Sequence, residues 1–355
     1  MIWCHVVAKH PRKAQQGFVA LLVVFLVVLA TAAYLANALN SNMVNTDKDI
    51  RTSAALAEAK AALINWSVAN STMPGTLPCP DTDNSGTENP SIAAQQCLAK
   101  IGRLPWQTLG LKDIRDGYGE CLWYALTPVY GDAIPTAARS VGAGNVINSA
   151  VAGAITIQDA TGANLPPAIN PVIAVIFAAG PALNVQDRTT VGNPVCGGNV
   201  TASNYLDTDT ASGIDNSTGN GRGDTFIAGA PSTSFNDKLV YITAHEFYQS
   251  VSKRIVRELL GNVAGNSGLI HYYNNNANTF PCPLGKGPVC PGAVGNIDPT
   301  GLNYPQLSLW LTNNNWFATE TYKYTNPTHV KVTVPYPAGS YSCDANANIF
   351  TCSSP

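Results

Sequence analysis

The stretch GFVALLVVFLVVLATAAYLANALN (residues 17–40) contains no charged side chain, and none follows it until Asp47. A run of about 20 apolar residues is long enough to cross a bilayer as a helix. A short basic segment over residues 9–13 precedes the run, and no small-x-small cleavage site typical of secretory signals follows it. Because basic flanks stay in the cytoplasm, the sequence predicts a transmembrane helix over residues 18–39, with the rest of the chain beyond the membrane.

The junction at the start of this run has a second interpretation. Basic residues are followed by Gly17-Phe18 and then by the apolar helix. Over residues 9–66 this arrangement resembles the leader and first helix of type IV prepilins. The resemblance implies that prepilin peptidase cuts between Gly17 and Phe18, and that Phe18 becomes the N-methylated first residue of the mature chain. It also implies that other pilin subunits are the partners. The alternative is an uncleaved signal anchor.

One position departs from the pattern of major pilins, which carry Glu as the fifth mature residue. Here that position is Leu22, and the chain looks more like minor pilins and the K-type tip pseudopilin of type II secretion. The resemblance therefore implies a minor or tip subunit, held in the inner membrane with its body in the periplasm until it enters a surface filament or a periplasmic pseudopilus. Two alternatives are the major subunit of an unusual large-headed pilus, and a membrane-anchored extracytoplasmic binding or adhesion protein.

The composition indicates a loop-rich body outside the cytoplasm. Only 12% of the 355 residues are charged and the net charge is −2, whereas glycine and proline number 30 and 24. We expect no cluster of Lys and Arg outside the leader, so the charge pattern gives no reason to expect a nucleic-acid partner.

The cysteines predict a disulfide framework. Cleavage after Gly17 would remove Cys4 and leave an even number of cysteines, all beyond the membrane, where disulfides form. Structural zinc is the alternative, but no CxxC pair occurs. Short loops favour the pairings Cys282–Cys290 and Cys343–Cys352, and they make Cys79–Cys97 plausible. The pairing Cys121–Cys196 is then left by elimination.

The membrane helix is expected to continue into the body. Apolar residues recur at three- and four-residue spacing from Ala55 to Leu63, and no proline occurs between Phe18 and Met73. We therefore predict one long helix over residues 18–66, half anchor and half scaffold, which ends before the Pro74-Gly75 breaker.

Several later segments have clear secondary-structure signals. Three predicted strands are CLWYAL at 121–126, PVIAVIFAAG at 171–180 and HVKVTVPY at 329–336. Residues 237–261 predict a strand and then a helix, with Thr243 and Glu246 as a capping box and Gly261 as the C-terminal cap. Six aromatic residues are expected in the core rather than on a carbohydrate-binding platform: Trp106, Trp123, Tyr124, Trp310, Trp316 and Phe317.

The rest of the chain contains a candidate internal repeat. Two series of short motifs occur in the same order: LINW at 63–66, PCP around Cys79, Pro105 and WYA at 123–125; then LIHY at 269–272, PCP around Cys282, Pro305 and WFA at 316–318. We interpret them as two related head modules, residues 67–236 and 237–355, each a helix followed by an antiparallel sheet. After a leader of residues 1–17, the predicted fold class is α+β, with a long pilin-type helix carrying two disulfide-stapled modules.

One loop could hold a metal ion. Asp81, Asp83, Ser85 and Thr87 have the alternate spacing of the start of an EF-hand calcium loop, with Gly86 at the sixth position, but the glutamate expected at the twelfth position is absent. The alternative is an ordinary Asp/Asn/Ser/Gly turn. No other cofactor is expected. Because HExxH, GxSxG, P-loop and dinucleotide motifs are all missing, we expect no enzymatic activity.

Overall fold

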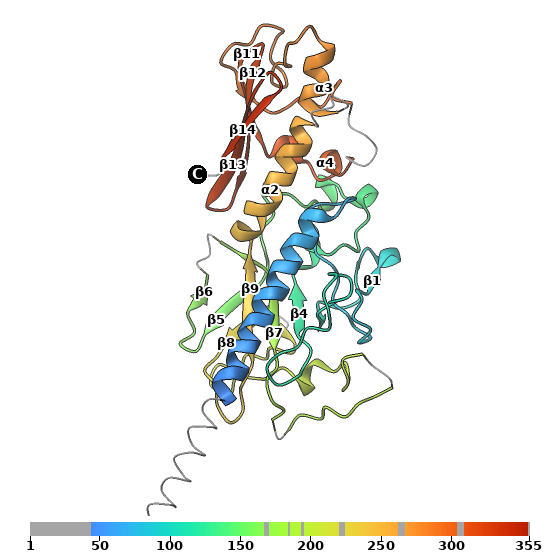
Figure 1. Ribbon diagram of the computed structural model, residues 1–355, viewed down its shortest axis with the longest axis vertical. Helices are drawn as coiled ribbons and strands as arrows, with labels where there is room; N and C mark the ends of the chain where they lie inside the picture. The colour runs from blue at the N-terminus through green and yellow to red at the C-terminus, as the bar shows by residue number, and fades with distance from the viewer. Residues whose placement is uncertain are drawn as a thin grey trace, which may run out of the picture. The chain divides into compact units, whose positions relative to one another are not determined.

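The chain of the computed structural model forms two compact units, residues 1–50 and 51–355. Figure 1 shows the helices and strands of the described residues. The structure describes residues 44–166, 170–183, 185–192, 195–219, 224–261, 267–303 and 309–353. The predicted transmembrane span and the Gly17-Phe18 junction lie outside these ranges. Within them, no helix is both long enough and apolar enough to span a bilayer.

The first described helix covers residues 44–69. Within the larger unit, its buried side chains recur every three or four residues, from Ala55 and Leu56 through Ala59 to Leu63. This is the predicted apolar stripe, and the helix ends five residues before Pro74, as the breaker signal indicated. The scaffold half of the predicted helix is therefore present.

A four-stranded antiparallel sheet lies against this stripe, in the order β3-β4-β7-β9. In β7, Ile176 lies in the same core as Leu63, whereas Phe177 points to the opposite face and a second core. Burial on both faces explains why the predicted strand is an unbroken apolar run. The strands are β3 (Ile101–Arg103), β4 (Trp123–Leu126), β7 (Val172–Ala178) and β9 (Lys238–Thr243).

A smaller three-stranded sheet, ordered β6-β5-β8, contributes to the second core through Ile157 and Phe226. Its β5 and β8 are parallel, with Ile157 opposite Phe226, so the expectation of purely antiparallel sheets is wrong here. No strand is predicted from the sequence at these segments, which are only two to four residues long. The strands are β5 (Thr156–Asp159), β6 (Asn164–Leu165) and β8 (Thr225–Ala228), and a further small antiparallel pair is β1 (Pro90–Ser91) with β2 (Gln96–Cys97).

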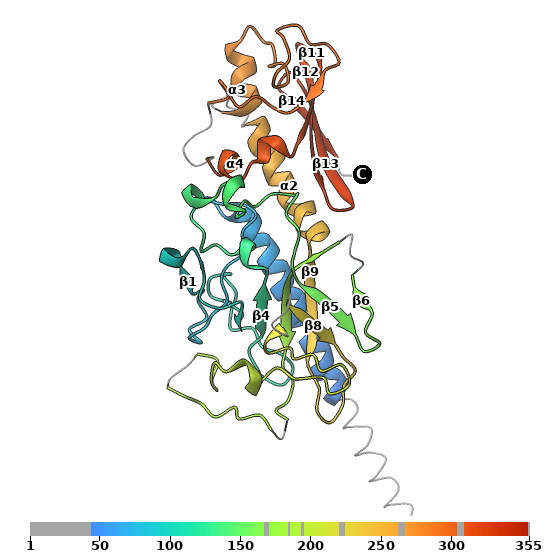
Figure 2. The ribbon, with the colours of Figure 1, turned by 180° about the vertical axis from the view of Figure 1, so that it is seen from behind.

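Helix α2 (Ala244–Leu260) follows β9 directly and packs against a second, five-stranded antiparallel sheet (Figure 2). Its predicted C-terminal cap is confirmed, because Gly261 ends the helix at φ 90°. The capping box is confirmed in one of its two bonds: the Thr243 hydroxyl accepts the Glu246 N–H, while the Glu246 carboxylate contacts Lys60. The strands of this sheet, in spatial order, are β10 (Val294–Gly295), β11 (Thr321–Asn326), β12 (His329–Tyr336), β13 (Gly339–Asn346) and β14 (Ile349–Ser353).

Short helices complete the described part of the chain. The α-helices are α3 (Gly268–Asn275) and α4 (Leu309–Asn313). Single 3₁₀ turns cover Ile92–Ala94, Pro128–Tyr130, Thr136–Ala138, Val141–Ala143, Ala202–Asn204 and Trp316–Ala318.

Two details of the predicted repeat need correction. The WYA motif at 123–125 lies in strand β4, but its counterpart WFA at 316–318 forms a 3₁₀ turn. The module boundary after residue 236 also divides the first sheet, because β9 pairs with β7 through Tyr241 and Val175. Strand pairing between distant segments, rather than motif order, decides where this sheet ends.

The predicted disulfide framework is confirmed in all four pairings. Cys79 is joined to Cys97, Cys121 to Cys196, Cys282 to Cys290 and Cys343 to Cys352. The expected burial of the aromatic residues is also present: Tyr124, Trp310, Trp316 and Phe317 are buried in the core shared with Leu63, Trp106 is partly buried against it, and Trp123 is buried in the second core. The described body is therefore an α+β, disulfide-stapled fold.

Candidate functional site

The processing residues form the first candidate site. Gly17, Phe18 and Leu22 lie outside the described residues, so the predicted cleavage and filament position stay predictions.

The predicted calcium loop forms a turn built around one carboxylate. Asp81 is almost fully buried; its Oδ1 accepts the N–H groups of Asp83, Asn84 and Ser85, and its Oδ2 accepts that of Gly86 at 2.7 Å. These contacts resemble those of an Asx turn, in which a carboxylate satisfies successive backbone donors. Burial raises the pKa of Asp81, although the backbone donors oppose the shift.

The other predicted ligands lie around the same turn. Asp83 is exposed, and its hydrogen bond with Ser85 lowers the pKa of the Asp83 carboxyl. The hydroxyls of Ser85 and Thr87 lie 2.7 Å apart. The four predicted residues therefore lie in one loop. Both carboxylate oxygens of Asp81 already accept hydrogen bonds from backbone N–H groups of that loop. Calcium binding by this loop stays a prediction.

A buried acidic pair, Asp207 and Asp237, occurs elsewhere, and its sequence spacing matches no ligand motif. Asp237 Oδ2 accepts the Asp207 N–H at 2.8 Å and the Asn216 amide at 3.1 Å, while Asp207 Oδ1 accepts the Gln186 amide. Burial, followed by the nearby Asp207 charge, raises the pKa of Asp237 well above its ordinary value. These bonds connect loops distant in sequence, so the pair has a structural role in holding them together.

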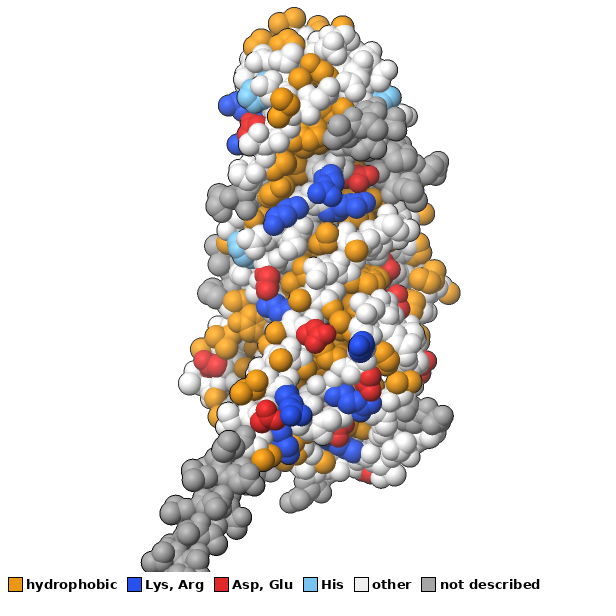
Figure 3. Space-filling view, in the orientation of Figure 1, with side chains coloured by type: hydrophobic (Ala, Val, Ile, Leu, Met, Phe, Trp, Pro, Cys, Tyr) orange, Lys and Arg blue, Asp and Glu red, His pale blue; other side chains and the backbone are white. Residues whose placement is uncertain are grey.

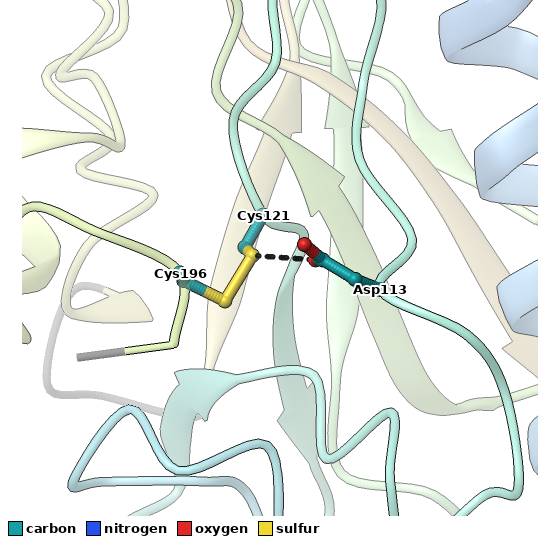
Figure 4. Close-up of side chains that lie close together, drawn as sticks. All are labelled: Asp113, Cys121 and Cys196. Carbon is teal, nitrogen blue, oxygen red and sulfur yellow. Dashed lines mark hydrogen bonds between the residues drawn. A yellow bond between two sulfur atoms is a disulfide. The ribbon is translucent and has the colours of Figure 1, made fainter.

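One group combines a carboxylate with two cysteines (Figure 4). Asp113 Oδ1 lies 3.6 Å from Cys121 Sγ, and Cys121 is bonded to Cys196 at 2.07 Å. Because a disulfide sulfur carries neither a proton nor a thiolate charge, this contact is not a metal-ligand set in the oxidised form. The group serves as a covalent link between two loops.

A basic groove lies between α2 and the helix over residues 44–69. It has a volume of about 270 Å³ and is lined by Asn65, Val68, Ala69, Lys253, Arg254 and Arg257. Figure 3 shows Lys and Arg side chains gathered over α2 on this face. The expectation of no Lys/Arg cluster outside the leader is therefore wrong. The sequence SKRIVR at 252–257 already places three cations within five residues, a local signal that the low overall charge obscured.

Comparisons with protein-family models, with curated proteins and with solved structures each found no match to this chain. The function must therefore be inferred from its own residues and their arrangement.

Proposed function

We propose that the protein is a structural subunit of a type IV pilus or a related type II secretion-like filament, and that it is a minor or tip subunit processed by prepilin peptidase. The observation that carries this proposal is the helix over residues 44–69. Its stripe from Ala55 to Leu63 is buried in a disulfide-stapled α+β body, and the uncharged run of residues 17–40 precedes it in the sequence. A helix that is apolar in its first half and scaffolds a head in its second suits a filament subunit.

The two halves of the sequence would perform different tasks. Before assembly, the run over residues 18–39 is stored in the inner membrane. In the filament it packs against the same segments of neighbouring subunits, and burial of apolar surface contributes about 25 cal/mol per Å². The disulfides suit a body that matures in an oxidising compartment outside the cytoplasm.

Leu22 supports the tip position. In major pilins the glutamate at this place pairs with the N-terminal amine of a neighbouring subunit. Leucine has no carboxylate with which to pair the amine of a neighbour. Leucine at this position is therefore compatible with a subunit that has no neighbour above it. We propose other pilin subunits, the inner membrane and prepilin peptidase as the partners of this chain.

The test is processing of the full-length protein in cells that contain a prepilin peptidase. We expect mass spectrometry of the purified wild type to find N-methylated Phe18 as the first residue. Gly17→Ala should retain the leader and run as a larger species, whereas the neighbouring control Gln16→Ala should be processed normally. An intact Met1 in the wild type, or equal sizes for wild type and Gly17→Ala, would favour an uncleaved membrane anchor.

A further inference from the structure

Among the described residues, the carboxylates that contact the basic groove do not balance its positive charge. Lys253 and Arg257 are one helical turn apart on α2 and both are exposed. In the described part of the chain, neither side chain takes part in an ion pair or hydrogen bond. Like charges at this spacing repel one another and destabilise a helix. The repulsion between Lys253 and Arg257 is therefore not offset by an ion pair with any described residue.

Arg254, the third cation, is only weakly paired. Its Nη2 lies 3.5 Å from Glu258 Oε2, and its buried Nε finds no acceptor within the described residues. Among the described residues, Arg254 is the only one of the three cations that contacts a carboxylate, that of Glu258. A guanidinium satisfied at one weak contact retains donors for another anion.

Elsewhere between the same two helices, a lysine on one helix is paired with a carboxylate on the other. There, Lys60 Nζ lies 2.6 Å from Glu246 Oε2. At the groove, the helix over residues 44–69 offers the uncharged amide of Asn65 and the small apolar side chains of Val68 and Ala69. Its last turn adds only the partial negative charge of a helix end, about half a unit, which cannot balance the cations of α2.

We propose that the groove binds a tetrahedral oxyanion of the phosphate class, either as free phosphate or as a phosphate displayed by a lipid headgroup. Two arginines and one lysine supply charge and forked N–H donors, the combination that recognises phosphate oxygens. A single carboxylate would balance only one cation, whereas a dianionic phosphate balances two. Asn65 adds a neutral amide at the groove wall, and about 270 Å³ is room enough for one such group.

The test uses the full-length protein in nanodiscs of zwitterionic lipid and inorganic phosphate as the probe. Because exposed ion pairs are weak, we expect a dissociation constant of about 0.1–10 mM at low salt, measured by ³¹P line broadening. Lys253→Gln/Arg257→Gln should weaken binding about tenfold or more. Lys112→Gln/Lys323→Gln, which removes the same charge from exposed sites outside the groove, should leave it unchanged. Circular dichroism verifies that both variants are folded.

Two further probes identify the source of the phosphate. Cosedimentation with vesicles containing phosphatidic acid, lost in the groove variant, supports a lipid headgroup; binding of inorganic phosphate without vesicle binding supports a free anion. Equal phosphate binding by wild type and groove variant would overturn the proposal, as would no binding of either probe. Groove-dependent binding of polyglutamate alone would also overturn it, because it would identify an acidic protein partner instead.

Discussion

Lys60 on the helix over residues 44–69 contacts Glu246 in the first turn of α2, with 2.6 Å between Nζ and Oε2. The two helices are far apart in sequence, and this ion pair lies at the surface where they meet. It joins the helix that scaffolds the first sheet to the helix that packs on the second. Glu246 is also favourably placed near the positive end of α2.

The stability contributed by this ion pair should be small. The side chains of Lys60 and Glu246 are 25% and 40% exposed, so solvent screens their attraction. A double-mutant cycle with Lys60→Met and Glu246→Gln should give a coupling of about 0.2–1 kcal/mol at low salt. Urea unfolding of the four proteins in detergent measures it, and 0.5 M salt should reduce the coupling. A salt-independent coupling above about 2 kcal/mol would show that the pair is effectively buried.

Glu320 should make stability pH-dependent. Its Oε1 accepts the Ile297 N–H at 3.0 Å while its buried Oε2 has no partner within the described residues, and burial raises the pKa of Glu320 to about 7. Because the folded pKa exceeds the ordinary value of 4.5, the contribution is fully present below pH 4.5 and is lost as pH rises through about 7. The loss should be about 3 kcal/mol between pH 4 and pH 8.

The matched variant for this prediction is Glu320→Gln, which keeps an oxygen for Ile297 but cannot ionise. The difference in free energy of unfolding between wild type and variant, measured with urea at pH 4, 6 and 8, isolates the Glu320 contribution from all other titrating groups. A difference that stays constant over this range would mean that Glu320 keeps its ordinary pKa.

Local patterns in the sequence predicted the local structure well. The stripe ending at Leu63, the Thr243 cap and the alternation of β12 each depend on residues close together in the chain, where spacing alone determines which side chains share a face. The short disulfide loops follow the same logic, and the longest pairing, Cys121–Cys196, then remained by elimination.

Pairing between distant segments could not be predicted in this way. β9 joins β7 across about 60 residues, and β5 lies parallel to β8 through partners that carry no strong strand signal. The basic groove is a similar case. Lys253 and Arg257 are neighbours by sequence, but their position opposite Asn65 depends on how two helices pack.

The disulfides should differ in their contributions to stability according to the loops they close. Cys121 and Cys196 are 75 residues apart, whereas Cys282 and Cys290 are 8 apart. Loop-closure entropy predicts losses of about 4.5 and about 2.5 kcal/mol when each pair is replaced by alanine. Urea unfolding of Cys121→Ala/Cys196→Ala and Cys282→Ala/Cys290→Ala measures them. A larger loss for the short loop would show that native packing, rather than restriction of the unfolded chain, dominates.

Asp81 should stabilise its loop whether or not calcium is present. Both of its carboxylate oxygens accept backbone N–H groups, those of Asn84 and Gly86 at 2.7 Å. Asp81→Ala leaves these donors without their acceptor, at a cost on the order of 1–3 kcal/mol, and we expect the same loss in calcium and in EGTA. The control Asp83→Asn, at an exposed position, should have little effect on the unfolding midpoint.

The same measurements test the calcium prediction. A ligand that binds only the folded state raises the free energy of unfolding in proportion to the logarithm of its concentration above the dissociation constant. If the loop holds calcium, the wild-type midpoint will therefore rise as calcium is added, and Asp83→Asn will abolish the rise. If the midpoint of the wild type is the same in millimolar calcium and in EGTA while Asp81→Ala remains destabilised, the loop is a turn organised by one buried carboxylate.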